Sequence, residues 1–231
     1  PNADFHQLVA DMAKIPRSQA KAINLGLFYG MGKAKLEAEL GVSKDKAKEL
    51  FDIYHSKVPF VKQLTNKLMT AAQRNGKIKT ILNRKCRFPK YEPVLKGNDW
   101  GKYIPPQDHE RMLELQAMGP HMKDEEGEFI IDKDGNKQKN YWHENDSRRA
   151  FTYKALNKLI QGSAADMTKK AMLELYKEGI IPHIQIHDEL DISVESDEKA
   201  DKIKSVMEHA VDLQIPNKVD YESGPNWGEI K

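Results

Sequence analysis

The chain has 231 residues, which is enough for one or two domains with a sizeable core. Lys and Arg number 37 and Asp and Glu 35, so the formal net charge of +2 excludes a global attraction to polyanions or membranes, and any nucleic-acid site must come from local clusters of charge. The single cysteine, Cys86, excludes an internal disulfide, and no apolar run approaches the roughly 20 residues of a membrane span, so we expect a soluble intracellular chain.

The first third of the chain is predicted to be nearly all helical. Helical periodicity runs through residues 4–14 and 17–31, and it is interrupted at Pro16, whose fixed φ angle and missing N–H suit the first turn of the second helix. Ser43 fits a helix N-cap ahead of a further amphipathic segment. Three more helices are expected, over KAKLEAELG at 33–41, SKDKAKELFDIYHSK at 43–57 and residues 59 to about 75.

In the middle of the chain the helical pattern gives way to predicted strands and then to irregular sequence. Residues 77–88, KIKTILNRKCRF, are rich in β-branched and basic side chains and predict a hairpin or a pair of short strands around Asn83. From 89 to 146 the periodicity fails, apart from a helical piece at 110–117. We interpret residues 89–146 as an excursion from the core.

Part of this excursion resembles a calcium loop, with Asp132, Asp134 and Asn136 as candidate ligands. The glycine, however, stands at the fourth loop position instead of the sixth, and no Glu stands at the twelfth. An Asp-Gly hairpin turn is the better interpretation, because that dipeptide favours the positive φ angles that such a turn needs.

The last third combines helices with short strands. Residues 147–178 are patterned as a helix that is split near Gln161, and a second helix is expected over 197–213. Between them, IIPHIQI and LDISVE are predicted strands that flank residues 187–189, His-Asp-Glu, in a tight hairpin turn. A final short strand and tail follow. Helices first and a small antiparallel set of strands later predict the α+β class.

The helix predicted at 17–31 carries a stripe of related side chains. At about 100° per residue, a spacing of four places Arg17, Lys21, Leu25 and Tyr29 along one gently wound line. Two long cations one turn apart can bind a polyphosphate, and the apolar and aromatic side chains beyond them, each followed by a glycine, can support a sugar and a base. The alternative is a solvated amphipathic helix whose cations face water.

Several motifs occur in one order along the chain. RSQAKAINLGLFYGM at 17–31 resembles the R-x3-K-x3-F/Y-x3-YG motif of the bacterial DNA polymerase I family, which is family A and includes phage replicative polymerases. Further segments similar to that family, in family order, are DFH at 4–6, IQGSAAD at 160–166, IHDEL at 186–190 and GPNW at 224–227. The resemblance therefore covers almost the whole chain.

This resemblance implies an α+β fold made of fingers helices plus a partial palm, with the small antiparallel sheet of a right-hand polymerase. The fingers would occupy residues 1–76, with the nucleotide-binding helix at about 17–31. Residues 77–146 would hold a strand pair and a family-variable insertion. Residues 147–231 would be the palm part, with the QGSAAD helix, the HDE hairpin and a C-terminal tail.

The resemblance also implies nucleotide-binding roles. Arg17 and Lys21 would bind the triphosphate of the incoming nucleotide, and His6 would contribute a phosphate contact. Lys21 could also donate a proton to the leaving pyrophosphate. Tyr29 would stack at the insertion site beside the templating base. Leu25 departs from the usual Phe or Tyr next to the 3′ position of the sugar, which puts sugar discrimination and insertion rate in question.

Other residues are implied to contact DNA. Asn157 and Gln161, four apart on one helix face, match positions that hydrogen-bond primer and template in the minor groove, where amide donors can check the shape of a base pair. Tyr153 stands roughly where many bacterial members have Arg. Gly30 would let a base come close, and His187 would contact the backbone of the primer strand. Outside this family context, an Asn and a Gln on a helix are ordinary surface residues.

The HDE turn is implied to hold a metal ion. Asp188 would be a Mg²⁺ ligand and Glu189 an auxiliary acid near the primer terminus, in a complete site with two Mg²⁺ ions. Without the resemblance, His-Asp-Glu is more simply a polar turn, and three residues are too few for a zinc site. The Glu after Asp favours DNA synthesis over transcription, because the related single-subunit RNA polymerases tend to have Ser there.

The function implied is DNA-directed DNA synthesis, in which the primer 3′-OH attacks the α-phosphate of a dNTP by two-metal phosphoryl transfer. The first motif of the family, D-x-S-x-x-E-x-R, should lie upstream of DFH. We therefore expect the first catalytic Asp to come from an upstream polymerase portion, in the same longer chain or in a separate subunit. The alternative function is a noncatalytic module that binds primer-template or nucleotide.

The expected partners are primer-template DNA, dNTP and the upstream polymerase portion, with a processivity factor as a further candidate and without a membrane. The expected location is the cytoplasm of a bacterial cell or of a phage-infected host cell. The excursion mixes cations with aromatic side chains, as single-strand binders do, and could contact DNA or a processivity partner; a solvated loop is the alternative. The residues concerned are Lys90, Lys96, Trp100, Lys102 and Tyr103.

Overall fold

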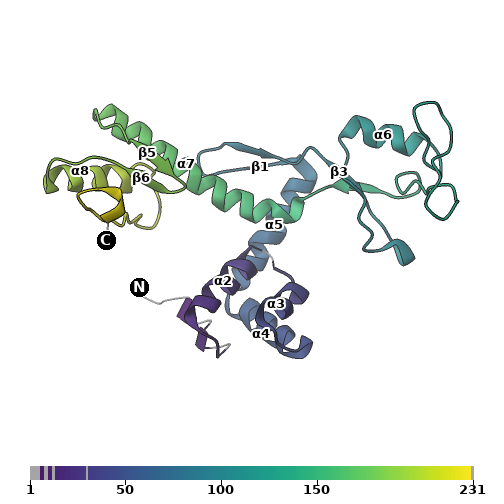
Figure 1. The fold of residues 1–231 in the computed structure, drawn as a ribbon, viewed down its shortest axis with the longest axis horizontal. Helices are drawn as coiled ribbons and strands as arrows, with labels where there is room; N and C mark the ends of the chain where they lie inside the picture. The colour runs from purple at the N-terminus through teal and green to yellow at the C-terminus, as the bar shows by residue number, and fades with distance from the viewer. Residues whose placement is uncertain (1–5, 8–9, 12–13, 30, 230–231) are drawn as a thin grey trace. The chain divides into compact units, whose positions relative to one another are not determined.

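The structure is a computed structural model that describes residues 6–7, 10–11, 14–29 and 31–229 (Figure 1). The chain divides into two compact units. Unit 1 comprises Pro1–Ile78 and Lys85–Lys158, and unit 2 comprises Lys79–Arg84 and Leu159–Lys231. Helices and small antiparallel sheets occur together, which confirms the α+β class.

Helix α2 (Arg17–Phe28) opens the helical part of unit 1. Pro16 is its N-cap residue, with a ψ angle of 144°, so the proline precedes the first turn instead of lying in it. The helix ends at Phe28, three residues before the predicted end. Its buried side chains recur at the three- and four-residue spacing of a helix that packs one face on a core. They are Ala20, Ile23, Asn24 and Leu27.

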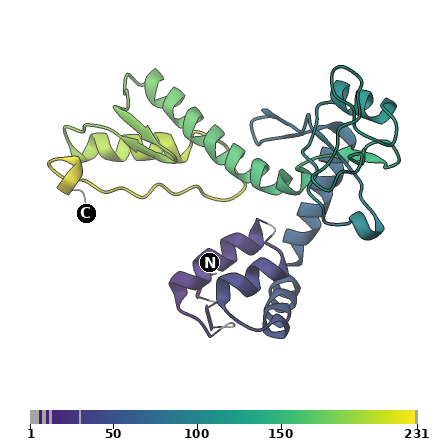
Figure 2. The same cartoon turned by 45° about the vertical axis from the view of Figure 1, so that its right-hand side comes forward.

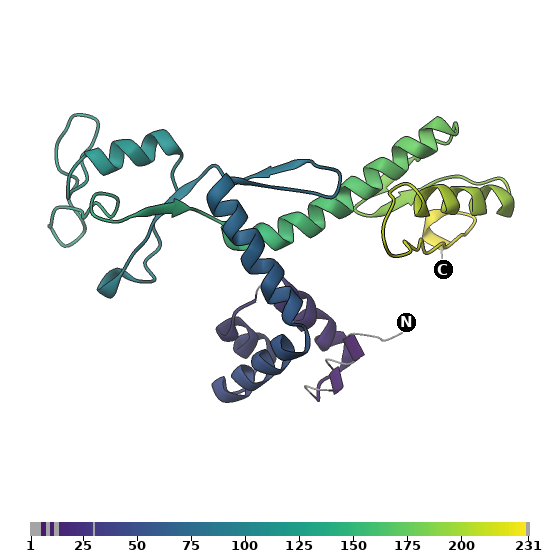
Figure 3. The ribbon, with the colours of Figure 1, turned by 180° about the vertical axis from the view of Figure 1, so that it is seen from behind.

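Three further helices follow where the sequence predicts them. Ser43 is the N-cap of the second, and its Oγ accepts a hydrogen bond from the Lys46 N–H at 3.3 Å. Gly41 ends the first with a φ angle of 62°, a left-handed conformation that glycine adopts without steric cost. The three helices are α3 (Lys33–Leu40), α4 (Lys44–Lys57) and α5 (Pro59–Asn75). Seen from behind in Figure 3, α5 leads away from α3 and α4 toward the strands of unit 1.

Two small sheets follow α5. Strands β1 (Lys77–Lys79) and β2 (Lys85–Arg87) form the predicted hairpin, with Asn83 at a φ angle of 64° in its tip. Strand β3 (Tyr91–Pro93) pairs antiparallel with β4 (Ser147–Arg149). The prediction of a helix from residue 147 is therefore wrong at its start, because this segment pairs with a strand far away in the sequence.

Gln73, near the end of α5, connects the helix to β4. Its amide nitrogen donates to the Arg149 carbonyl at 2.8 Å and to Thr152 Oγ1 at 2.9 Å, and its amide oxygen accepts from the Arg149 N–H at 2.9 Å. The Arg149 side chain in turn covers Gly76, where an added Cβ would lie 2.7 Å from the guanidinium carbon. One glutamine thus satisfies both backbone groups of a strand residue.

We expect Gln73→Leu to lower the free energy of unfolding by about 2–3 kcal/mol, because the Arg149 N–H and carbonyl lose their partners while the shape is kept. Gln63→Leu is the control, since Gln63 is exposed on the same helix and its replacement should change stability by no more than about 0.5 kcal/mol. Urea denaturation of both variants measures this. Equal losses would show that the Gln73 network carries no special stability.

The excursion has a small core of its own. Met112 and Leu115 of α6 (His109–Ala117) pack with Trp142, and the buried Asn140 side chain donates to two carbonyls at 2.6 and 2.7 Å. A short 3-10 turn, η1 (Gly97–Asp99), precedes α6. The segment is therefore folded, not a loose loop.

The Asp-Gly turn is confirmed. Asp132 Oδ1 accepts hydrogen bonds from the backbone N–H groups of Asp134 and Asn136, both at 2.9 Å, and Gly135 has a φ angle of 81°. Within the described ranges of the chain, no group of three or more His, Cys, Asp or Glu is arranged to hold a metal ion.

The chain then enters a 3-10 turn, η2 (Thr152–Lys154), and the long helix α7 (Ala155–Lys177). This helix is continuous, so the predicted split near Gln161 is wrong. Gly162 costs a helix about 1 kcal/mol relative to Ala. Hydrogen bonds from the tip of the β1–β2 hairpin to Gly162 and Ser163 offset that cost, and the sequence pattern alone does not reveal such contacts.

The rest of unit 2 packs on the second half of α7. Leu175 and Ile180 form a core with Ile203, and side chains of the hairpin pack against it. Figure 2 shows the last helix beside the two strands. The elements are β5 (Ile184–Ile186), β6 (Glu189–Asp191) and α8 (Asp197–Glu208), followed by a 3-10 turn, η3 (Trp227–Glu229).

Unit 2 corrects two details of the prediction. Glu189 is the first residue of β6 and does not lie in the turn. Residues 218–224 form no strand. The two strands of the hairpin are at most half-buried, and Ile184 is 41% exposed. Among the helices described, none is both long and apolar enough to cross a membrane.

Candidate functional site

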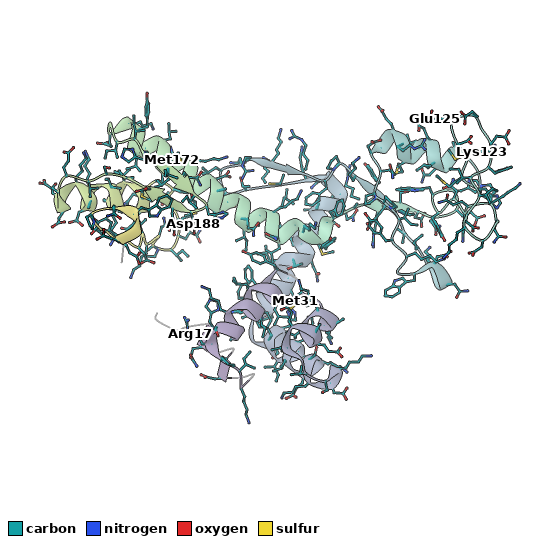
Figure 4. All side chains as sticks on the ribbon, viewed as in Figure 1. Arg17, Met31, Lys123, Glu125, Met172 and Asp188 are labelled. Carbon is teal, nitrogen blue, oxygen red and sulfur yellow. The ribbon has the colours of Figure 1, made fainter. Side chains whose placement is uncertain are left out.

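The predicted stripe lies on the solvent face of α2. Arg17, Lys21 and Leu25 are exposed, Leu25 to 44%, and Tyr29 is partly exposed. Their mean direction is roughly 130° round the helix axis from the buried face. Arg17 is labelled in Figure 4 near the start of the helix. The core therefore fixes the orientation of α2, and the two cations point away from it.

The absence of a side chain at Gly26 makes room for Met31 within unit 1. A Cβ added there would overlap Cε of Met31, and the Met31 N–H donates to the Gly26 carbonyl at 2.8 Å. Met31, labelled in Figure 4, thus folds back over the helix directly after the stripe. Gly30 lies outside the described residues.

His6 is linked to α2 by a residue that the sequence analysis does not single out. The Asn24 side-chain nitrogen lies 3.1 Å from His6 Nδ1, and Asn24 is 3% exposed. The two atoms are within hydrogen-bond distance of each other. Asn24 therefore sets the ring orientation. Its position among apolar residues on the buried face of α2 is the signal that could have identified it.

The HDE tripeptide spans the turn and the first residue of β6. Ile186 pairs with Glu189, which leaves His187 and Asp188 as the two turn residues. His187 has a φ angle of 53°, and its carbonyl accepts from the Gln185 side chain at 2.5 Å. Asp188, labelled in Figure 4, is exposed at the end of the hairpin. The turn is thus closed by a local hydrogen bond and presents one carboxylate outward.

The donor set at this turn suits a hard cation only in part. Mg²⁺ is bound by one or two carboxylates together with water and substrate phosphates, and Asp188 offers one exposed carboxylate of the required kind. Its neighbour Glu189 belongs to the strand. A cluster of three ligating side chains is absent from the described part of the chain. The turn can therefore supply one ligand to a shared site, but it is not a metal site by itself.

The implied minor-groove residues lie on α7. Gln161 is exposed, and Tyr153, just before the helix, is 58% exposed. Asn157 is partly buried, and its side-chain oxygen is buried with no hydrogen-bond partner among the described residues. A buried polar atom without a partner is uncommon in native structures.

Five of the eight Lys and Arg of the excursion lie in ion pairs with carboxylates. Lys96 Nζ lies 3.9 Å from Asp146, and Lys102 and Lys139 hold Asp99 at 2.7 and 2.6 Å. Hydrogen bonds from these two lysines lower the pKa of the Asp99 carboxyl. Lys90 lies 3.6 Å from Asp108. Trp100 and Tyr103 remain 81% and 78% exposed.

The charge of the whole excursion is acidic. Residues 89–146 contain eight Lys and Arg and thirteen Asp and Glu. A DNA-binding surface needs cations that are available to phosphates. The pairing and the charge balance therefore favour the alternative of a solvated segment over a DNA contact.

A family model described as DNA polymerase family A matches residues 2–229. The chain belongs to this family. The match includes the α2 stripe and the HDE hairpin, and it confirms the resemblance drawn from the motifs of the sequence.

Similar proteins include a DNA-directed DNA polymerase of Pseudomonas phage M6, 31% identical over 262 residues, covering 99% of this chain and 32% of that protein. DNA polymerase I of Geobacillus stearothermophilus is 28% identical over 237 residues, covering 98% of this chain and 21% of that protein. The chain thus spans about a third or less of the length of these relatives.

A solved structure supports the fold. The POL domain of Pol1 from M. smegmatis, in complex with DNA primer-template and dNTP, matches with a TM-score of 0.59 and 23% identity. The match covers 92% of this chain and 32% of that one. The arrangement of elements is therefore that of a polymerase domain.

Proposed function

We propose that this chain is the fingers and later palm part of a DNA-directed DNA polymerase, which adds dNTPs to a primer 3′-OH on a DNA template. The observation that carries the proposal is the α2 stripe, two exposed cations one turn apart with Leu25 and Tyr29 beyond them, in a chain of family A. Similar proteins named as DNA polymerases support it. The parts would be fingers at 1–76, strand pair and insertion at 77–146, and palm at 147–231.

In this proposal α2 binds the incoming nucleotide. Arg17 offers paired planar donors to phosphate oxygens, and Lys21 offers a mobile ammonium that can also protonate the leaving pyrophosphate. His6, oriented by Asn24, contributes a phosphate contact. Tyr29 stacks beside the templating base. Most of the rate enhancement then comes from positioning and charge neutralisation.

The DNA would be held by α7 and the HDE turn. Asn157 and Gln161 would donate to minor-groove acceptors, which have similar positions in all Watson–Crick pairs. His187 would contact the primer backbone, and Gly30 would allow close approach of a base.

Asp188 would hold Mg²⁺ in a site shared with substrate phosphates, with Glu189 as an auxiliary acid near the primer terminus. Two such ions, when bound, stabilise the attacking and the leaving oxygens of the in-line displacement. A second carboxylate would come from an upstream polymerase portion, in a longer chain or a separate subunit. We place the assembled enzyme in the cytoplasm of a bacterial or phage-infected cell, with a possible processivity factor.

Single-nucleotide primer extension tests the proposal. The polymerase that contains this chain is incubated with primer-template, Mg²⁺ and each dNTP in turn, with a chelator as control. We expect addition only of the nucleotide complementary to the template base, and only with metal. Binding of primer-template without any addition would support the alternative, a noncatalytic binding module.

Leu25 gives a prediction about sugar selection. Because Leu25 is 44% exposed, Phe fits there without disturbing the core, and Leu25→Phe should change the ratio of dideoxynucleotide to deoxynucleotide incorporation by at least about threefold. Leu113→Phe, at a site 49% exposed on α6, is the control and should leave the ratio unchanged. Equal ratios in wild type and Leu25→Phe would reject a role for this side chain in sugar selection.

A further inference from the structure

The tip of the β1–β2 hairpin is attached to α7 by hydrogen bonds within unit 2. The Arg84 guanidinium donates through Nε to Asp166 Oδ1 at 2.6 Å and through Nη2 to the Gly162 carbonyl at 2.7 Å. The Ile81 N–H donates to Ser163 Oγ at 3.0 Å. We call these three hydrogen bonds the tip clamp. They join residues that are about 80 positions apart in the sequence.

The attachment is polar. Ile81 and Leu82, the apolar side chains of the tip, are each 43% exposed, so little apolar surface holds the tip in place. Asp166, in contrast, is 6% exposed. A buried carboxylate needs a charged or hydrogen-bonding partner, and Arg84 supplies it. Burial opposes ionisation, but hydrogen bonds from Thr80 and Arg84 outweigh it and lower the pKa of Asp166.

The tip is also closed on itself before it meets α7. The Thr80 N–H donates to the Arg84 carbonyl at 2.9 Å, and the Arg84 N–H donates to Thr80 Oγ1 at 3.0 Å. Thr80 is 5% exposed. The backbone of Arg84 is therefore fixed, and its guanidinium loses less freedom when it binds the helix.

The clamp contacts the weakest turn of α7. The sequence Gln161-Gly162-Ser163 disfavours a helix and predicts a break, yet the helix is continuous there. Gly162 and Ser163 are two of the three residues that the clamp binds, and Asp166 is one turn further on. The clamp thus braces the place where α7 would otherwise bend.

Gln161 lies on the other side of this turn. At 100° per residue, the three clamped residues are between about 100° and 200° round the helix from Gln161. Gln161 is exposed, whereas Asp166 is buried under the tip. A bend at Gly162 would therefore move the Gln161 side chain, while an intact clamp holds it pointing away from the hairpin.

We propose that Arg84 and Asp166 are positioning residues, which brace α7 from behind so that Gln161 is presented to the minor groove at the primer terminus. This inference rests on the proposed function of the chain. It predicts that losing the clamp acts on DNA synthesis through Gln161, and not through a general loss of folding.

A double-mutant cycle in the polymerase that contains this chain tests this. Gln161→Ala and Arg84→Met should each slow extension of a matched primer by about tenfold. The double variant should extend the primer at about the same rate as each single variant, because both substitutions remove the same contact. Asp166→Asn keeps the shape and should slow extension about threefold, again with no added effect of Gln161→Ala. Arg84→Lys keeps the charge but loses one of the two hydrogen bonds, and it should be intermediate.

The control is Glu174→Gln, which breaks ion pairs with Lys170 and Lys177 elsewhere on α7. It should leave extension unchanged. Melting temperatures identify a variant that fails to fold. If Arg84→Met does not fold, Asp166→Asn tests the positioning role in its place. Asp166→Asn is the milder change, because the half-exposed Arg84 guanidinium stays hydrated when its charged partner is lost.

The two hypotheses fail separately. The positioning role would be overturned if the reductions in extension rate caused by Asp166→Asn and Gln161→Ala multiplied in the double variant. It would also be overturned if Glu174→Gln reduced the extension rate as much as Arg84→Met does. Wild-type enzyme that binds primer-template but extends nothing would overturn the proposed function.

Discussion

Asp188→Asn is expected to reduce primer extension by about 1,000-fold or more while leaving the affinity for primer-template within about threefold of wild type. The reason is that Asp188 is an exposed carboxylate at the end of a hairpin turn and has no part in the packing of the strands. Rapid-quench measurement of single-nucleotide addition gives the rate, and fluorescence anisotropy of labelled DNA gives the affinity.

The matched control for this prediction is Asp201→Asn, which removes an exposed carboxylate from α8 in the same unit. It should leave both quantities unchanged. An Asp188→Asn enzyme that extends primers at the wild-type rate would exclude this residue as a metal ligand. A loss of DNA affinity as large as the loss of rate would assign it to binding instead of chemistry.

Lys21→Met should lower kcat/KM for the incoming dNTP by about 100- to 1,000-fold, because it removes a cation from the developing charge on the phosphates and a proton donor for the leaving pyrophosphate. The side chain is exposed on α2, so the melting temperature should not change. Steady-state kinetics with varied dNTP concentration measures the effect.

Lys35→Met is the control for Lys21→Met. Lys35 is exposed on α3, one helix further along, and carries the same charge outside the stripe. Its replacement should leave kcat/KM within about twofold. Equal reductions in the two variants would mean that the fingers act only through their overall charge, and that the spacing of the stripe has no special role.

The helical part of this fold is predictable from sequence because its signals are local. Ser43 caps α4, Gly41 and Gly76 end α3 and α5, and α2 buries side chains at helical spacing. The stripe follows from the same periodicity, since fixing the buried face of a helix fixes its exposed face.

The errors occur where distant segments meet. β4 forms because it pairs with β3, and α7 runs through Gly162 because Arg84 and Ile81 bind that turn from the hairpin tip. Neither partner is near in sequence, so periodicity misses both. Asn24 differs from these two cases, because its place among the apolar residues on the buried face of α2 is a local signal, although its contact with His6 is not local.

The most direct test of the central claim is formation of a ternary complex on a primer that ends in a dideoxynucleotide, followed by gel shift with each dNTP in turn. This measurement requires the nucleotide and DNA sites but no chemistry. The account predicts that only the dNTP complementary to the template base stabilises the complex, and that Lys21→Met abolishes the effect. Stabilisation by all four dNTPs alike, or by none, would contradict the claim that this chain selects nucleotides on a template.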